Sequence, residues 1–293
     1  MTQPKKSYLP HALVLLAGIT WGLCGLFNRH LAAYGFSSTG IVILRNLGAA
    51  VLLGLVLLLT DRKAFRIRLR HLPIFLGSGV VSILIFTLCY FRSQQVNTLA
   101  LAAILMYTAP AFVMLLSALL FREKVTGKKL LALVLAFGGC VLASGLVGGG
   151  LELTLTGLLL GLGSGLFYAS YTIFARLAMR HYGTMTVTFY TFVVAALGSL
   201  VLWLFGVGDL ASAAWTGGAV WNLAGLLLLS TVAPYLLYTR GMEGLRDGGK
   251  ASILASIEPV VAAIVGVLAF GEPMGLGVLG GLACIVASVV ILR

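Results

Sequence analysis

The residue of this sequence with the most chemistry to offer is Glu258, an acid inside an apolar stretch. The other seven acids lie at or near the ends of such stretches: Asp61, Glu123, Glu152, Asp209, Glu243, Asp247 and Glu272. Glu258 follows the start of its stretch by about eight residues, which places it roughly 12 Å deep in an apolar layer about 30 Å thick. A carboxylate there must face a partner or a wet cavity. Glu258 can bind a proton or a substrate amine; a structural acid beside backbone freed by Pro259 is the alternative.

Arg45 is the natural counterpart of Glu258. It lies about seven residues, or about 10 Å, into another apolar stretch. The remaining vertical gap between the two residues is roughly 8 Å, most of which an arginine side chain could cover. We expect Arg45 to bind a substrate carboxylate through two parallel hydrogen bonds. The alternative is a side chain that extends to the lipid head groups.

Aromatic rings and two prolines complete the set of candidate site residues. The aromatic candidates for the cavity lining are Trp21, Tyr90, Tyr107, Tyr168 and Tyr171, whose rings can stack on a solute. Tyr190, Tyr235 and Tyr238 add further aromatic surface, although tyrosines near the end of a span more often anchor it at the membrane interface. Pro110 and Pro259 each remove a helical hydrogen bond near mid-span, which predicts a hinge or a static kink.

The composition of the chain requires a lipid bilayer as its solvent. Hydrophobic residues make up 60% of the 293 residues and charged residues only 10%, whereas a soluble domain carries roughly a quarter charged residues. The net charge of +12 does not indicate nucleic acid, because the basic residues lie in short gaps between apolar stretches. No phosphate-binding loop, metalloprotease motif or paired deep acids occur, so we expect neither an enzyme nor a cofactor or metal.

Apolar stretches of about 20 residues predict ten membrane-spanning helices and an all-α fold. Of the 20 Lys and Arg residues, 17 fall in segments on one side of the membrane, which leaves only Arg29, Arg45 and Arg92. The chain is thus predicted to be a multi-pass protein of the inner (plasma) membrane. The positive-inside rule then places both of its termini in the cytoplasm. The predicted spans are 11–31, 38–60, 72–92, 97–121, 128–147, 156–178, 185–206, 217–239, 250–270 and 274–292.

The sequence repeats itself after about half its length. Pro110 and Pro259 are 149 residues apart, and so are Glu123 and Glu272. Trp21 and Arg29 stand eight residues apart, as do Tyr168 and Arg176. The repeats cover 11–147 and 156–292 and hold five spans each. Because five is odd, the second repeat must be inverted, a plan typical of secondary transporters with a midplane substrate site.

These motifs resemble the drug/metabolite transporter superfamily, in particular ten-helix exporters built from two EamA-type domains. The resemblance rests on Thr20-Trp21-Gly22, Arg45, the segment from Pro110 to Glu123 and the segment from Glu258 to Glu272. It implies export of amino acids, metabolites or drug-like molecules, usually without ATP. The second repeat departs from the first, because no arginine in the span 185–206 matches Arg45.

The expected partners are a small-molecule substrate, the bilayer and, as a candidate coupling ion, the proton. Two alternatives stay open: an uptake permease or facilitator for sugars or sugar conjugates, and a membrane scaffold or lipid-handling protein without transport. Glycines spaced four apart, at 18 and 22, 161 and 165, and 277 and 281, predict close helix packing. The last pair also makes the final span the best candidate for dimerisation, so the chain is a monomer or a homodimer.

Overall fold

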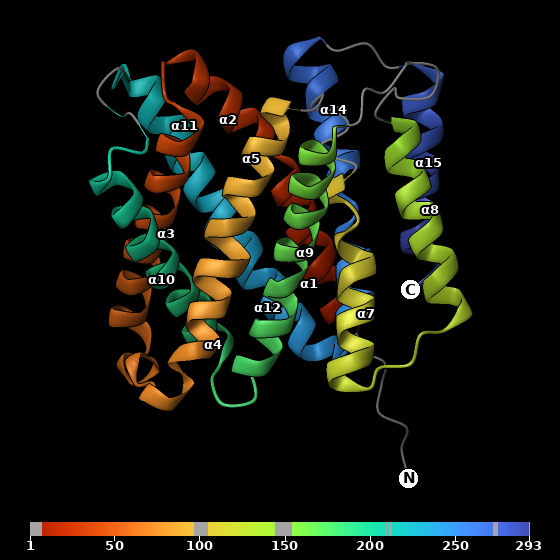
Figure 1. Cartoon of the computed structure of the whole chain (residues 1–293), viewed down its shortest axis with the longest axis horizontal. Helices are drawn as coiled ribbons and strands as arrows, with labels where there is room; N and C mark the ends of the chain where they lie inside the picture. Colours follow the sequence, from red (N-terminus) through yellow and green to blue (C-terminus); the bar gives the residue numbers. More distant parts are fainter. Residues whose placement is uncertain are drawn as a thin grey trace.

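The computed structural model describes residues 8–96, 105–143, 154–208, 210, 213–271 and 275–292. Throughout these residues the regular structure is helical, and the helices stand side by side in one bundle (Figure 1). Ten helical segments cross this bundle, as the hydropathy pattern predicts. Seven of them are long and apolar enough to span a bilayer. The shorter helices α7, α8 and α15 complete the set within the described part of the chain.

The first repeat contributes five segments. α1 (Leu9–Gly22) and α2 (Cys24–Ala33) form the first, and α3 (Ser38–Thr60) the second. The short 3-10 turns η1 (Arg62–Phe65) and η2 (Leu69–His71) lead into the third segment, made of α4 (Leu72–Leu76), the π-helix η3 (Gly77–Ile85) and α5 (Phe86–Val96). The fourth segment includes α7 (Ala109–Phe121), and α8 (Gly127–Ala143) is the fifth.

The second repeat has the same order of elements. It runs through α9 (Leu155–Ala178), α10 (Thr184–Leu204), α11 (Gly217–Leu227), the π-helix η4 (Leu228–Val232) and α12 (Ala233–Leu245), followed by α13 (Gly248–Ala255), α14 (Glu258–Phe270) and α15 (Leu276–Ile291). α7 and α14 are both 13 residues long and start 149 residues apart. Both repeats also carry a π-helix in their third segment, which argues that the duplication preserved local geometry and not only hydropathy.

Side-chain caps fix the starts of several segments. Ser37, Thr154 and Thr216 accept a hydrogen bond from the backbone N–H three residues on, at 3.1, 3.1 and 3.3 Å. Asp247 accepts from the Lys250 N–H at 2.9 Å. Such caps satisfy amide groups that a helix leaves free in its first turn. Each of these four segments therefore begins at a polar residue and continues into an apolar run.

The repeats are inverted relative to each other, and matching contacts occur at both ends of the bundle. Phe174 packs on Gly77 in η3, and its repeat equivalent Phe27 packs on Gly225 next to η4. α7 ends at the lower end of the molecule in Figure 1, whereas α14 ends at the upper end. The basic loops after α3, α7, α9 and α12 all lie at the lower end, which we call the basic end. The predicted segregation of positive charge is therefore present in the fold.

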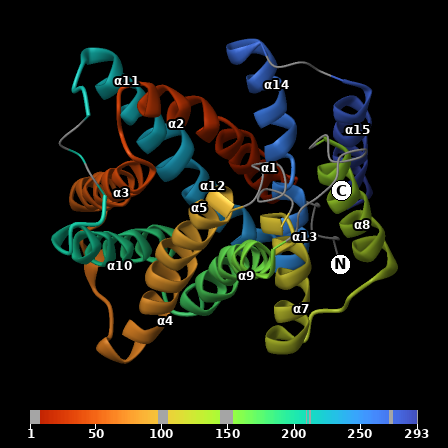
Figure 2. The same ribbon diagram turned by 45° about the horizontal axis from the view of Figure 1, so that its top comes forward.

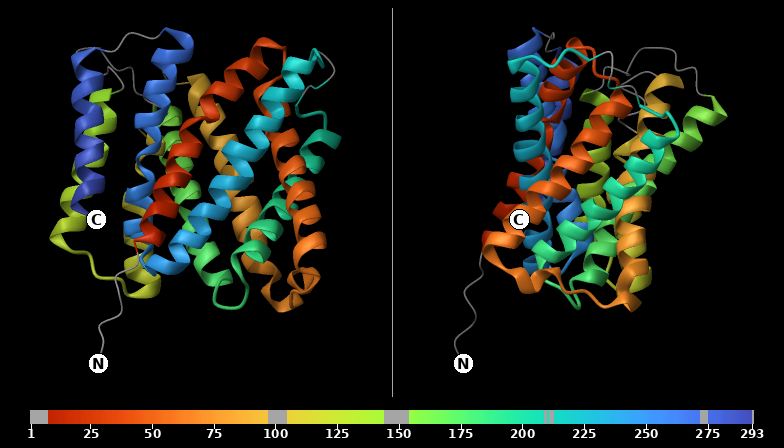
Figure 3. Two further views of the ribbon diagram at one scale, coloured as in Figure 1. Left: turned by 180° about the vertical axis from the view of Figure 1, so that it is seen from behind. Right: turned by 90° about the vertical axis from the view of Figure 1, so that its left-hand side faces the viewer.

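The paired glycines bring helices into close contact inside the chain, as their spacing predicts. A Cβ on Gly18 would lie 2.6 Å from the Ala255 carbonyl oxygen, and one on Gly165 would lie 3.0 Å from the Leu105 carbonyl oxygen. Gly139 of α8 packs in the same way against the carbonyl of Gly281 in α15. α8 and α15 thus form a pair at one edge of the bundle (Figures 2 and 3). Gly277 and Gly281, the predicted dimer motif, face this neighbour within the same chain.

Candidate functional site

Two interrupted spans, one from each repeat, frame the site. Helical geometry breaks at Tyr107 and Thr108 before α7, and at Ser256 and Ile257 between α13 and α14. Pro110 and Pro259 occupy the first turn of the helix that follows each break. A proline there removes no hydrogen bond from the new helix but prevents continuous bonding with the preceding turn. The predicted interruptions near mid-span are therefore present, and their role as hinges stays a prediction.

A cavity lies where the two interruptions meet. It contains about 450 Å³ of space not filled by atoms, its mouth included, most of it in narrow crevices between side chains. Its walls come from both repeats: Trp21, Tyr107, Pro110, Val113, Tyr168, Ala169, Tyr171, Thr172, Tyr235, Tyr238, Ser252, Ala255, Ser256 and Glu258.

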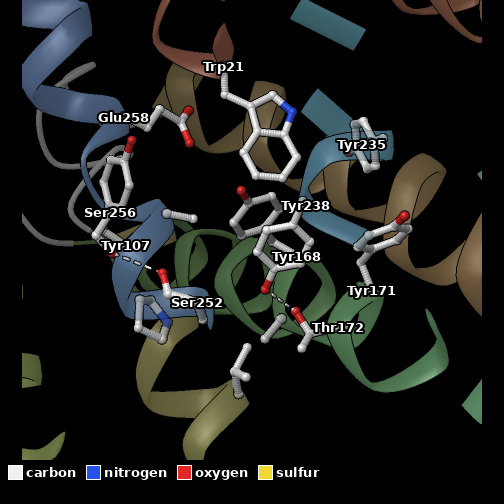
Figure 4. Close-up of a pocket in the computed structure, with 14 residues that line it drawn as sticks. Trp21, Tyr107, Tyr168, Tyr171, Thr172, Tyr235, Tyr238, Ser252, Ser256 and Glu258 are labelled. Carbon is white, nitrogen blue, oxygen red and sulfur yellow. Dashed lines mark hydrogen bonds between the residues drawn. The ribbon is translucent and has the colours of Figure 1, made fainter. Parts of the chain in front are cut away.

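Aromatic rings form the centre of this cavity (Figure 4). The Trp21 ring contacts those of Tyr235 and Tyr238, with centroids 5.3 and 5.4 Å apart. Tyr171 meets Tyr235 edge-on at 5.0 Å. The hydroxyls of Tyr171 and Tyr238 are held by Thr239 at 2.7 Å and Thr172 at 2.8 Å. These bonds fix the ring orientations, so the chamber offers a preformed aromatic surface with few free polar groups.

Glu258 is the acidic group of this site. It is the first residue of α14, where the positive end of the helix dipole favours a carboxylate. Its carboxyl group lies near the Tyr107 hydroxyl, and Tyr168, Cys24 and Cys140 are further neighbours. In Figure 4 it projects from α14 toward the rings of the chamber. The sequence-based prediction of an acid facing a cavity in the membrane therefore matches its place in the structure.

Arg45 lies beside the cavity but does not line it. Its guanidinium lies near Tyr235, a wall residue, and near Cys24. The Nε and Nη2 atoms are buried without a hydrogen-bond partner. Among the described residues, no salt bridge joins Arg45 to Glu258 or to another acid. Arg45 is thus a cation with unused donors, next to the wall residue Tyr235.

The structure brings together most of the predicted site residues. Trp21, Tyr107, Tyr168, Tyr171, Pro110 and Glu258 all line the cavity. Tyr90 does not; it stacks on Phe86 at 5.9 Å, and Phe86 in turn contacts Tyr168 at 5.1 Å. Tyr90 therefore supports the wall from behind. Pro259 follows Glu258 in α14 but is also absent from the lining.

Tyr235 and Tyr238 are wall residues for which the sequence pattern favoured a place at the membrane interface over the cavity. The predicted span ended at residue 239, just before Arg240, which put both tyrosines near the membrane surface. Helix α12 continues to Leu245, because the exposed Arg240 pairs with Glu243 one turn on at 2.7 Å and both can remain hydrated. Both tyrosines lie on a buried face of α12. Their spacing of three residues, which places them on one helix face, was the available signal.

The described residues contain no group of three or more His, Cys, Asp or Glu side chains that could hold a metal ion. The four cysteines are all free thiols. The groups that the described residues present at the cavity are aromatic faces, hydroxyl groups and one carboxyl, with the Arg45 guanidinium beside it. These are groups for reversible binding of an organic solute.

An inverted-repeat helical bundle with a cavity between its interrupted spans is the architecture of a membrane transporter. Comparison with known proteins agrees with this class. Residues 9–145 and 155–293 each match the EamA-like transporter family. The chain therefore belongs to the EamA-like transporter family, which is a family of transporters and not of enzymes.

Relatives of known sequence fit the same class. An uncharacterized transporter of Archaeoglobus fulgidus is 35% identical over 203 residues, which cover 69% of this chain and 70% of the relative. The uncharacterized inner membrane transporter YicL of Salmonella typhimurium is 26% identical and covers 95% of this chain, with 93% of YicL matched. A crystal structure with 18% identity superposes with a TM-score of 0.81 over 96% of this chain and 95% of the solved chain. The last similarity establishes the fold.

Proposed function

We propose that this transporter exports small metabolites, amino acids or drug-like molecules across the inner membrane by alternating access. The observation that carries the proposal is the position of the cavity at the crossing of the two interrupted spans. Trp21 and Tyr168, which are repeat equivalents, face each other there. A site on the axis that relates two inverted repeats can be reached from either side when one repeat tilts against the other.

The residues in and beside the wall have different roles in this proposal. The rings of Trp21, Tyr168 and Tyr238 stack on the solute, and Glu258 exchanges a proton or binds a substrate amine. Arg45 receives an anionic group of the solute once Tyr235 turns aside, because its free Nε and Nη2 form a planar fork that suits a carboxylate. Pro110 and Pro259 act as the hinges at which the second half of each interrupted span tilts.

The bundle faces the cytoplasm with its basic end, according to the positive-inside rule. Both chain termini then lie in the cytoplasm. A fluorescent protein that matures only in the cytoplasm, fused after Arg293, should give full fluorescence. Alkaline phosphatase fused at the same place should stay inactive. The opposite pattern would reverse the orientation and with it the inside and outside of the transport path.

Transport is tested with the purified protein in lipid vesicles. A thermal-shift screen first identifies solutes that stabilise the protein, and counterflow of the labelled solutes then measures transport. A pH gradient should drive their accumulation in the wild type and not in Glu258→Gln. Accumulation with the opposite sign of the gradient would favour the uptake permease. Binding without any flux would contradict the proposed function.

A further inference from the structure

A cluster of charged residues at the basic end ties the two repeats together. Glu123, which follows α7 in the first repeat, forms an ion pair with Arg176 of α9 in the second repeat. The same Glu123 oxygen accepts a hydrogen bond from the Gly248 N–H at the start of α13, at 3.1 Å. Arg176 also donates to the Arg246 carbonyl oxygen at 3.3 Å. The Glu123 carboxylate thus links the end of α7 in the first repeat to the end of α9 and the start of α13 in the second repeat.

A second ion pair also joins the two repeats at the basic end. Lys129 of α8 lies with its Nζ 2.7 Å from Asp247 Oδ2 and 3.8 Å from Glu123 Oε2. Its side chain is only 9% exposed, and that of Glu123 only 12%. Lys129 is therefore a largely buried cation between two acids, one from each repeat. Removal of Lys129 would leave Asp247 without its cation, and removal of Asp247 would leave Lys129 with Glu123 alone at 3.8 Å. Either change is costly at low hydration.

On two separate elements, this cluster lies between the cavity and the basic end. On α9, Thr172 lines the cavity and Arg176 follows one turn later. On α13, Ser252 lines the cavity and Gly248 precedes it by one turn. One helical turn is about 5.4 Å. The charged cluster therefore lies about one helical turn from the chamber, on the side of the basic end.

The repeat symmetry gives this cluster a partial counterpart at the opposite end. Arg176 stacks on Phe121 with its guanidinium carbon 4.1 Å from the ring centroid, and Arg29 stacks on Phe270 at 4.7 Å. Phe121 and Phe270 are 149 residues apart, and Arg29 and Arg176 are 147 apart. Glu272, the sequence equivalent of Glu123, lies outside the described residues.

The second ion pair has no such counterpart in the sequence. The position 149 residues after Lys129 is Val278, and the position 149 residues before Asp247 is Thr98. A Val and a Thr cannot form an ion pair. The two ends of the bundle consequently share the arginine–phenylalanine stack but differ in the Lys129–Asp247 bridge.

We propose that Glu123, Lys129, Arg176 and Asp247 form the cytoplasmic gate of the transport path. In this proposal the Lys129–Asp247 bridge stabilises the conformation in which the path is closed to the cytoplasm. This closed conformation is the resting state. The inference rests on the alternating-access function proposed above. The gate can open reversibly because its charged groups regain water when the repeats separate, and that hydration offsets the lost Coulomb attraction.

Accessibility of the cavity from the cytoplasm tests the gate without any knowledge of the substrate. Ser252→Cys is introduced into a variant whose four natural cysteines are replaced by alanine. A membrane-impermeant maleimide is then applied to inside-out vesicles. The reporter should react slowly in this background. Asp247→Asn or Lys129→Met should raise its rate by roughly fivefold or more, as expected when a partly buried ion pair is lost.

Two further variants make the result specific. The charge exchange Lys129→Asp with Asp247→Lys should restore slow labelling, whereas Lys128→Met, at the exposed neighbouring lysine, should leave it unchanged. If Asp247→Asn labels at the same rate as the reporter background and only lowers the unfolding temperature, the gate proposal is wrong. The ion pairs would then only stabilise the fold. A gate that opens as expected in a protein that moves no solute would instead refute the transport proposal alone.

Discussion

Trp21 and Tyr168 meet edge-on in the cavity, with ring centroids 6.4 Å apart, although 147 residues separate them in the chain. They are repeat equivalents, one from α1 and one from α9. Their contact therefore marks the axis about which the two repeats are related. A solute between these rings would contact equivalent elements of both repeats, so tilting either repeat changes its surroundings in a similar way.

Equivalent positions around this axis carry different chemistry. Tyr107 precedes α7 by two residues, and the corresponding position before α14 is Ser256. Glu258 is the first residue of α14, and Ala109 is the first residue of α7. The scaffold is thus nearly symmetric, whereas the acid is present once. A coupling reaction at Glu258 would therefore involve one proton site per chain and not two.

The first prediction concerns Glu258. Glu258→Gln keeps the size and hydrogen-bonding capacity of the side chain but removes its titration. We expect accumulation driven by a pH gradient to disappear, while exchange of labelled for unlabelled solute continues, because a bound solute still fits the rings. Paired measurements of gradient-driven uptake and counterflow in vesicles check this. Undiminished gradient-driven transport in the variant would show that protons enter elsewhere.

The second prediction concerns Arg45. Because its Nε and Nη2 are buried without partners, the guanidinium costs stability in the empty protein. Arg45→Met should therefore keep or raise the unfolding temperature and lower transport of an anionic solute by roughly tenfold or more. Arg45→Ala should abolish transport while the protein remains in the membrane. Unfolding in detergent and flux in vesicles measure the two effects, and unchanged flux in both variants would refute the role.

The sequence predicted the fold well because a bilayer simplifies the problem. Spans must be apolar and about 20 residues long, so the start and end of α3 are those of the predicted span. Repeated prolines and glutamates then indicated the inversion. The same reasoning found Glu258, because a single acid deep in an apolar stretch is unusual.

Side-chain pairing across the bundle could not be predicted in this way. The cluster around Glu123 combines residues from four loops and helix ends, and each of them looked like an ordinary span terminus in the sequence. Arg45 and Glu258 seemed suitable partners by depth, but depth gives no position around the helix axis. In the structure Tyr235 takes the place of the expected carboxylate beside Arg45. Contacts of this kind depend on how the helices are rotated, which hydropathy does not record.

The third prediction concerns the glycines that hold α1 and α9 against the interrupted spans. A Cβ on Gly18 would lie 2.6 Å from the Ala255 carbonyl oxygen, and one on Gly165 would lie 2.5 Å from Thr108 Oγ1. Gly18→Ala and Gly165→Ala should each destabilise the protein by about 1–3 kcal/mol, because helices must move apart. Gly138→Ala is the matched control, since nothing lies within 4 Å of its added Cβ, and it should gain up to about 1 kcal/mol. Thermal unfolding of the three variants decides between packing and helix propensity; equal losses in all three would refute the packing argument.

The fourth prediction concerns the pH dependence of the gate. Burial raises the pKa of Asp247, but hydrogen bonds from Lys129 and from the Lys250 N–H, together with the Lys129 charge, outweigh it and hold the pKa below its ordinary value of 3.8. A depressed pKa means that the ion pair is complete above the ordinary value and is lost only as the pH falls through the lower one. Between pH 5 and pH 8, cytoplasmic labelling of Ser252→Cys should therefore stay constant when normalised to an exposed cysteine at Lys128→Cys. Faster normalised labelling toward pH 5 would contradict this.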